Sequence, residues 1–192
     1  MIRHLSYEQY TEMLWKNGQG VTHEVLRYPD SERYVWRISI ATIRTDGPFS
    51  CFPGYLRNIS VLEGAGMYLT IDGQRSAFIP PFQASDFHGD SEVSCQISGG
   101  PLLDFNVIYD AATVRAAVRW IDGGEWTHHA GTLLLFNAGE PLEIMAGAQD
   151  YCLQRYDSLL IDEPTAVALM RRAETRLACV RLSAPATPIN AR

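Results

Sequence analysis

The sequence contains no long apolar run and no cluster of basic residues, and each absence excludes a class of protein. Its 192 residues include 16 Lys and Arg against 22 Asp and Glu, which gives a formal charge of −6. Nucleic-acid binding needs a basic surface, so we expect no nucleic-acid partner. No apolar segment approaches the roughly 20 residues that cross a bilayer, and the first residues lack the apolar core of a signal peptide. The sequence therefore predicts a cytoplasmic protein without a membrane partner.

Cysteine is scarce and scattered. The four cysteines are Cys51, Cys95, Cys152 and Cys179, and no two of them form a CxxC pair. Without a secretion signal, an even number of cysteines is weak evidence for disulfides. We therefore expect reduced, partly buried thiols that pack as small apolar groups.

The sequence also lacks the usual motifs of metal and nucleophilic chemistry. The five histidines include no HxH pair. His128 and His129 are adjacent, so in a strand they would point to opposite faces and could not readily hold one ion. We predict a solvated turn for HHAG (128–131) and a loop for His88 beside Asp90. There is no G-x-S-x-G motif, no glycine-rich phosphate loop and no Cys/His motif. We expect neither a metal nor another cofactor.

What the sequence does contain is a succession of short strand-like segments. They are rich in β-branched and aromatic residues, as in RYVWRISIATI, LRNISVL, LLDFNVIY and GTLLLF. Turn-forming sequences such as TDGP, EGAG, SGGP and DGGE separate them. Many short strands at close spacing predict an all-β sandwich or barrel.

Two segments are exceptions to this pattern. Ser6 and Gln9 have the spacing of a capping box, which predicts a short helix ending near Trp15. The composition of residues 164–182 fits a helix, but two strands separated by a polar turn fit equally well. Residues 184–192 have little to bury, and we predict a loose tail.

An internal repeat indicates a duplicated β-fold. Shifting VLEGAGMYLTI (61–71) by 73 positions aligns it with LLFNAGEPLEI (134–144), with five identities. No linker rich in Pro, Ser or charge divides the chain. We therefore predict one unit over residues 1–192, with a first half at about 17–110 and a second half at about 111–183.

Several motifs in a fixed order resemble a known family. They are WKNGQGVTHEV (15–25), WRISIA (from Trp36), DGPFSCFPGYLR (46–57), VLEGAGMYLTIDG (61–73), PPF and FHGD (80–90), and GGPLLDFNV (99–107). Together they are similar to the HutD/Ves family of small bacterial proteins. The resemblance implies a bicupin, a double-stranded β-helix fold present twice, and a link to histidine utilisation or stress. It implies no established reaction.

Arg57 is the strongest candidate for a functional residue. In an extended strand it would share a face with Ile59, Val61 and Glu63, which indicates that it points into a core or pocket. A buried guanidinium needs a partner, and its fork matches a carboxylate ligand. Pairing with Glu63 or with Asp104 is an equally good explanation at this stage.

Other polar and aromatic residues extend this candidate site. Asp104 and Asn106 share a strand face with apolar neighbours, so they need polar partners of their own. Phe49, Phe52 and Phe87 could line an apolar cleft, although core packing explains any one of them as well. The predicted ligand-binding residues are Arg57, Trp36, Ser39, Phe49, Ser50, Phe52, Glu63, Phe87, Asp104 and Asn106.

We expect a metal-free, regulatory small-molecule-binding protein. The resemblance implies a small carboxylate from histidine breakdown as its ligand, such as urocanate, formylated glutamate or formate. One alternative is an enzyme acting on such a metabolite, with Glu63 or Asp104 as general base. Another is a structural interaction module with no ligand. The sequence leaves the oligomeric state open, including a homodimer.

Overall fold

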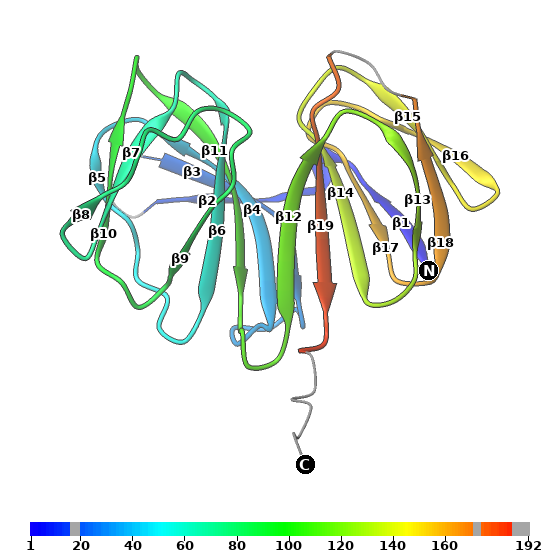
Figure 1. Cartoon of the computed structure of the whole chain (residues 1–192), viewed down its shortest axis with the longest axis horizontal. Helices are drawn as coiled ribbons and strands as arrows, with labels where there is room; N and C mark the ends of the chain where they lie inside the picture. Colours follow the sequence, from blue (N-terminus) through cyan, green and yellow to red (C-terminus); the bar gives the residue numbers. More distant parts are fainter. Residues whose placement is uncertain (16–19, 171–173, 186–192) are drawn as a thin grey trace.

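The computed structural model describes residues 1–15, 20–170 and 174–185, apart from the side chain of Trp126, and consists almost entirely of β-strands. Two lobes lie side by side, and each contains two facing sheets (Figure 1). The all-β prediction is confirmed. No helix in the described ranges has the length and apolarity needed to cross a membrane.

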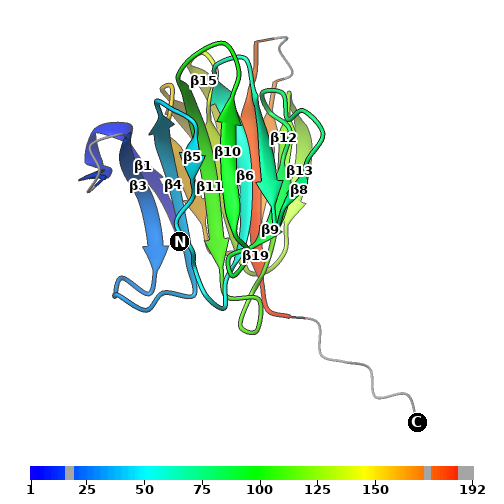
Figure 2. The same ribbon diagram turned by 90° about the vertical axis from the view of Figure 1, so that its left-hand side faces the viewer.

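The first lobe pairs a long sheet with a short one, and Figure 2 shows the short sheet in front of the long strands. The long sheet has the order β2 (Thr11–Leu14), β3 (Gly20–Tyr28), β4 (Trp36–Ile43), β11 (Leu102–Tyr109), β6 (Leu56–Glu63) and β9 (Ser85–His88). The short sheet has the order β5 (Gly47–Pro48), β10 (Val93–Ile97), β7 (Met67–Ile71) and β8 (Gln74–Arg75).

The second lobe repeats this arrangement. Its long sheet has the order β1 (Ile2–Leu5), β17 (Ser158–Ile161), β14 (Thr132–Asn137), β19 (Leu177–Ser183) and β12 (Arg115–Ile121). Its short sheet has the order β13 (Gly124–His128), β18 (Thr165–Leu169), β15 (Leu142–Ala146) and β16 (Gln149–Leu153). The repeated segments 61–71 and 134–144 lie on β6–β7 and β14–β15, which hold equivalent places in the two lobes.

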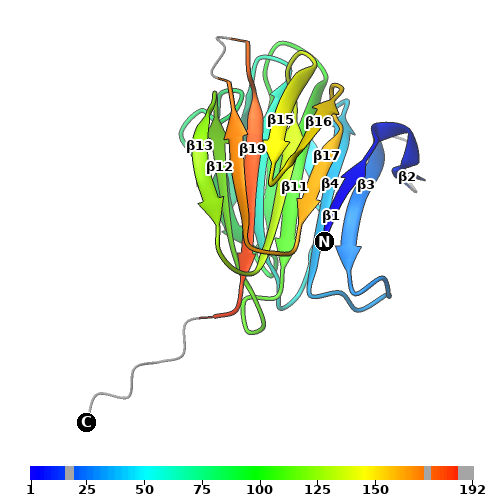
Figure 3. The ribbon, with the colours of Figure 1, turned by 90° about the vertical axis from the view of Figure 1, so that its right-hand side faces the viewer.

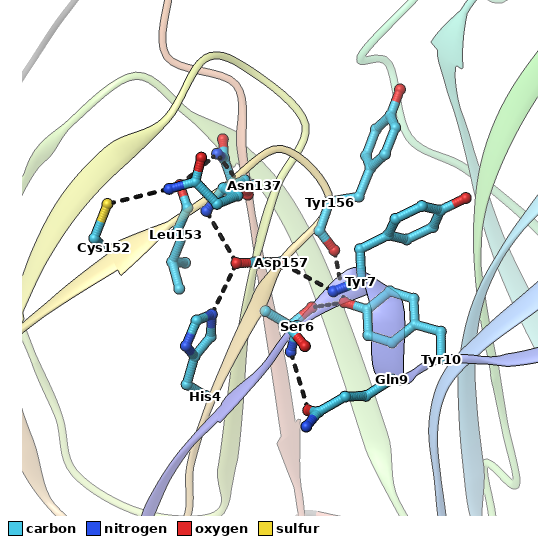
Figure 4. Close-up of polar contacts among 12 residues, drawn as sticks. His4, Ser6, Tyr7, Gln9, Tyr10, Asn137, Cys152, Leu153, Tyr156 and Asp157 are labelled. Carbon is cyan, nitrogen blue, oxygen red and sulfur yellow. Dashed lines mark hydrogen bonds and ion pairs between the residues drawn. The ribbon is translucent and has the colours of Figure 1, made fainter.

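The N-terminal strand belongs to the second lobe. β1 pairs antiparallel with β17, as Figure 3 shows, whereas β2 and β3 extend the first lobe. Polar contacts hold this crossing segment in place (Figure 4). His4 Nε2 lies 2.9 Å from Asp157 Oδ2, and the Tyr7 N–H donates to Asp157 Oδ1 at 2.9 Å. The Tyr10 hydroxyl donates to the Tyr156 carbonyl at 2.7 Å. The first ten residues therefore connect the lobes.

The predicted helix ending near Trp15 is wrong. The Ser6 N–H donates to Gln9 Oε1 at 3.4 Å, but only one 3₁₀ turn forms, at Tyr7–Gln9. Residues Thr11–Leu14 instead form β2, paired with β3. Cross-strand pairing outweighs a local helix signal in so short a segment.

Near the C-terminus, strands β18 and β19 confirm the strand alternative for residues 164–182. Of the predicted tail, residues 186–192 lie outside the described residues. All four cysteines are free, as expected, but Cys51 and Cys152 are exposed.

Three clusters of buried apolar residues form the core. One cluster fills the interior of each lobe, and the third lies where the two long sheets pack against each other. In this third cluster the Phe105 and Phe136 rings, one from each lobe, lie 4.7 Å apart between centroids. Ile38 and Ile40 of β4 belong to the same cluster, so the opposite face of β4 points into the first lobe.

Candidate functional site

A cavity of about 690 Å³ opens into the first lobe and gathers most of the predicted site. The predicted residues that line it are Ser39, Phe49, Ser50, Phe52, Arg57, Asp104 and Asn106. A second cavity, of about 880 Å³, is lined by residues of both lobes. Although it is larger, only the first cavity contains the buried Arg57, Asp104 and Asn106. We therefore take the first cavity as the candidate site.

Strand register places the polar residues in rows across β4, β11 and β6. Ile108 is the register partner of both Arg37 and Arg57, so the two arginines lie on either side of it. Asn106 pairs with Ser39, and Asp104 occupies the next row towards the N-terminal end of β11. Residues two apart on a strand share a face. The rows therefore form one polar wall of the cavity.

Arg57 is buried, with only 6% of its surface exposed. Its Nη2 donates to Asn106 Oδ1 at 2.8 Å, and its Nη1 donates to the Ser50 carbonyl at 3.3 Å. Its Nε has no hydrogen-bond partner among the described residues. Burial lowers the pKa of Arg57 to about 10, an effect that nearby Asp104 opposes, so the side chain stays charged at neutral pH.

Three aromatic rings surround this guanidinium. The centroids of Phe49, Phe52 and Phe87 lie 5.2, 5.1 and 4.9 Å from Arg57 Cζ. Ring faces at such distances attract a cation and also keep water away from it. They stabilise the positive charge without neutralising it.

The loop that carries two of these rings is held by backbone contacts. The Phe52 N–H donates to the Gly89 carbonyl at 2.8 Å, and Gly54, at φ +82°, donates to the Asp90 carboxylate at 3.1 Å. A Cβ on Gly89 would lie 2.3 Å from the Phe52 carbonyl oxygen, so only glycine fits there. The FHGD segment thus fixes the ring positions.

Asp104 and Asn106 complete the network. The Asn106 Nδ2 donates to Asp104 Oδ1 at 3.0 Å, and Asp104 is only 2% exposed. Burial raises the pKa of Asp104 to about 7, although Arg57, the Asn106 hydrogen bond and a backbone hydrogen bond at Ala41 act to lower it. A carboxyl group with this pKa can gain or lose a proton near neutral pH.

Three predicted residues lie outside the cavity wall. Phe87 is buried behind it and contacts the site through Arg57 and a stacked contact with Phe49. Trp36 points to the junction between the lobes and lines the second cavity. Glu63 is exposed and accepts hydrogen bonds from Arg155 and from the Tyr156 hydroxyl. The sequence-based pairing of Glu63 with Arg57 is therefore wrong.

Arg37 is the main cavity residue that was not predicted as a ligand contact. It extends into the cavity from β4, and its Nε donates to Glu24 Oε2 at 2.5 Å. Its side chain and that of Glu24 are 15% and 8% exposed. The sequence did contain a signal for it, because Arg37 is in phase with Ser39 on the same strand.

The histidines lie apart from this site. His128 ends β13 and is buried, with Nε2 donating to the Gly131 carbonyl at 2.9 Å, which differs from the prediction, whereas residues 129–131 form an exposed bend as predicted. His88 ends β9 rather than lying in a loop, and it is exposed. Among the described residues, no group of three or more His, Cys, Asp or Glu side chains could hold a metal ion.

Comparison with known proteins identifies relatives along almost the whole chain. The family model for HutD matches residues 7–179. An uncharacterised 21.2 kDa protein from the hutC 3′ region of Pseudomonas putida is 43% identical over 162 residues, covering 82% of this chain and 85% of that protein.

Solved structures agree with this relationship. The conserved protein of unknown function PA5104 from Pseudomonas aeruginosa PAO1 superimposes with a TM-score of 0.90 at 36% identity, over 96% of this chain and 100% of that one. HutD from Pseudomonas fluorescens SBW25, in a formate condition, gives a TM-score of 0.82 at 34% identity, with the same coverage.

A more distant structure shows the fold class. A cupin 2 conserved barrel domain protein from Leptotrichia buccalis gives a TM-score of 0.59 at 12% identity, over 89% of this chain and 92% of that one. Together with the two equivalent lobes, this confirms the predicted bicupin fold. The chain belongs to the HutD family.

Proposed function

We propose that this protein binds a small carboxylate from histidine breakdown in the first-lobe cavity, and that it does so in a regulatory role. The observation that carries the proposal is the state of Arg57. It is buried and charged, yet none of the ion pairs among the described residues includes it. Its partners are an amide oxygen, a carbonyl oxygen and three rings, which leave its charge available to an anion.

The family relationship supports the class of ligand. HutD from Pseudomonas fluorescens is known in a formate condition, and formate is the smallest carboxylate. A cavity of about 690 Å³ has room for a much larger acid. Urocanate and formylated glutamate are therefore better candidates here than formate alone.

A ligand that binds the native state raises the apparent stability, so thermal shift is a direct test. We expect at least one of formate, urocanate and formylated glutamate to raise Tm in a saturable way. Calorimetric titration of the same acid should give a binding constant, and the acid should be recovered unchanged. If none of these acids binds at millimolar concentration, the proposal is wrong.

One observation favours a second candidate, an enzyme acting on the same metabolites. Asp104 is a buried carboxyl group with a pKa of about 7, in the same network as Arg57, so it could serve as general base. Glu63, the other candidate base, lies outside the cavity. Consumption of the bound acid by purified protein, abolished in Asp104→Asn, would favour this function. If neither binding nor consumption is found, a structural interaction module remains.

A further inference from the structure

We infer that Arg37, held in place by Glu24, is a second anion-recognition residue, and that the cavity takes acids with a second carboxylate at their far end. This inference rests on the proposed function and defines its ligand class more narrowly. It uses a cavity residue that the Arg57 network does not include.

Arg37 is held by Glu24 and also interacts with the Tyr34 hydroxyl, which is not an anion. Its Nε edge is occupied by Glu24, with 2.5 Å between Arg37 Nε and Glu24 Oε2. Its Nη2 lies 3.8 Å from the sulfur of Met13, another residue of the cavity lining. A thioether is a weak acceptor, so a carboxylate entering the cavity would be the better partner for this nitrogen.

The charge of Arg37 is only partly neutralised. Glu24 also approaches Arg27, with 3.2 Å between Arg27 Nε and Glu24 Oε1, so one carboxylate serves two guanidinium groups. Arg37 and Arg57 line the same cavity, so their like charges repel each other, and the charge on Arg37 makes a small contribution to lowering the pKa of Arg57. An anion bound at each end would relieve this repulsion.

The register sets the spacing of the two ends. Arg37 and Arg57 both pair with Ile108, from the strands on either side of β11. Their Cα atoms are thus separated by two strand spacings, roughly 10 Å. Two long side chains reaching over Ile108 leave room for a short chain with a carboxylate at each end. Carboxylates are ionised at neutral pH, so both ends would be charged.

The test compares two series of probes by calorimetric titration. The dicarboxylates are succinate, glutarate and adipate, and the monocarboxylates are butyrate, valerate and hexanoate, which match them in carbon number. We expect one dicarboxylate to bind about tenfold to a hundredfold more tightly than its matched monocarboxylate. Arg37→Gln should weaken the dicarboxylates more than their matched monocarboxylates and so remove this advantage, whereas Arg57→Lys should weaken both series.

Arg27 is the other guanidinium partner of Glu24, and it does not line this cavity. Arg27→Gln is therefore the matched control. It should keep the dicarboxylate advantage, and Glu24→Gln should reduce it. Arg37→Lys keeps the charge without the fork, and it replaces Arg37→Gln in the test if the latter is unfolded by circular dichroism.

Monocarboxylate binding without a dicarboxylate advantage, or an advantage that persists in the Arg37 variant, would overturn the second contact and leave the proposed function standing. If neither series binds, the inference fails, whereas the proposed function is decided by formate, urocanate and formylated glutamate as described above.

Discussion

The side-chain amide of Asn106 donates to the Asp104 carboxylate at 3.0 Å, from two positions further along the same strand. Its amide oxygen accepts from Arg57 at 2.8 Å. The guanidinium and the carboxyl group are therefore connected through an amide rather than through direct contact. This arrangement lets the carboxyl group change its protonation state while the arginine keeps a hydrogen-bond partner.

The raised pKa of Asp104 predicts how stability depends on pH. The carboxyl group ionises near pH 4 in the unfolded chain but only near pH 7 in the folded protein. Folding therefore favours the protonated form of Asp104. The stability that this preference contributes to the folded protein is fully present below about pH 4 and is lost as the pH rises to about 7. Asp104→Asn should thus gain stability relative to the parent between pH 5 and pH 8, by an amount with an upper limit on the order of 4 kcal/mol.

Urea unfolding of both proteins across this pH range would measure the difference. Asp46→Asn serves as the comparison, because Asp46 is an exposed acid in the same lobe. A constant difference between the Asp104 variant and the parent from pH 4 to pH 8 would show that Asp104 ionises normally.

Arg57→Lys separates ligand recognition from structural support. Lysine keeps the charge but loses the fork that can hold a carboxylate with two hydrogen bonds. If Arg57 anchors the ligand, affinity should fall about tenfold to a hundredfold. Titration calorimetry and melting temperature measured on the same sample distinguish this outcome from a loss of stability alone.

Arg75→Lys provides a matched control for this substitution. Arg75 also lies over an aromatic ring, with Cζ 4.1 Å from the Tyr68 centroid, but it is exposed and away from the cavity. Its replacement should leave ligand affinity unchanged. Unchanged affinity in a folded Arg57→Lys variant would contradict the anchor role.

The shared core predicts that the two lobes unfold together. Phe136 of the second lobe packs on Phe105 of the first, and both are fully buried. Phe136→Ala should therefore cost about 3–5 kcal/mol and lower the stability of both lobes in one transition. Differential scanning calorimetry that resolved two transitions, only one of them shifted by the substitution, would rule out this coupling.

Metal removal should have no effect on the protein. Among the described residues the histidines and acids are too dispersed to form a three-ligand group. We expect treatment with EDTA to leave Tm and ligand binding unchanged. One tightly held transition-metal ion per chain, with loss of binding on chelation, would contradict this expectation.

Alternation along the strands made the polar wall predictable. Side chains two residues apart share a face, so Arg57 could be placed in a pocket, and Asp104 with Asn106 on one face, from the sequence alone. Alternation does not show which face is turned towards the cavity. Trp36 was therefore assigned to the ligand site, although its face packs against the other lobe.

The direction in which Glu63 points could be assigned only from the pairing of β6 with β11 in the structure. Leu103 pairs with Glu63 but Asp104 pairs with Val61, so β6 has one extra residue at that point. Such a bulge reverses the alternation, and the glutamate turns to the opposite face from Arg57. There its carboxylate accepts hydrogen bonds from the side chains of Arg155 and Tyr156, which belong to the second half of the chain. Nothing in the local sequence marks a bulge of this kind.

The partnership of β1 with β17 has a consequence for biosynthesis. His4 and its partner Asp157 are separated by 153 positions. At a synthesis rate of about 5–20 residues per second, the partner of the first strand is made roughly 8–30 s after that strand. The first lobe can assemble during translation, whereas the second lobe can close only by recruiting a strand from the start of the chain. β1, the first strand to be synthesised, is thus among the last to form its native strand pairing.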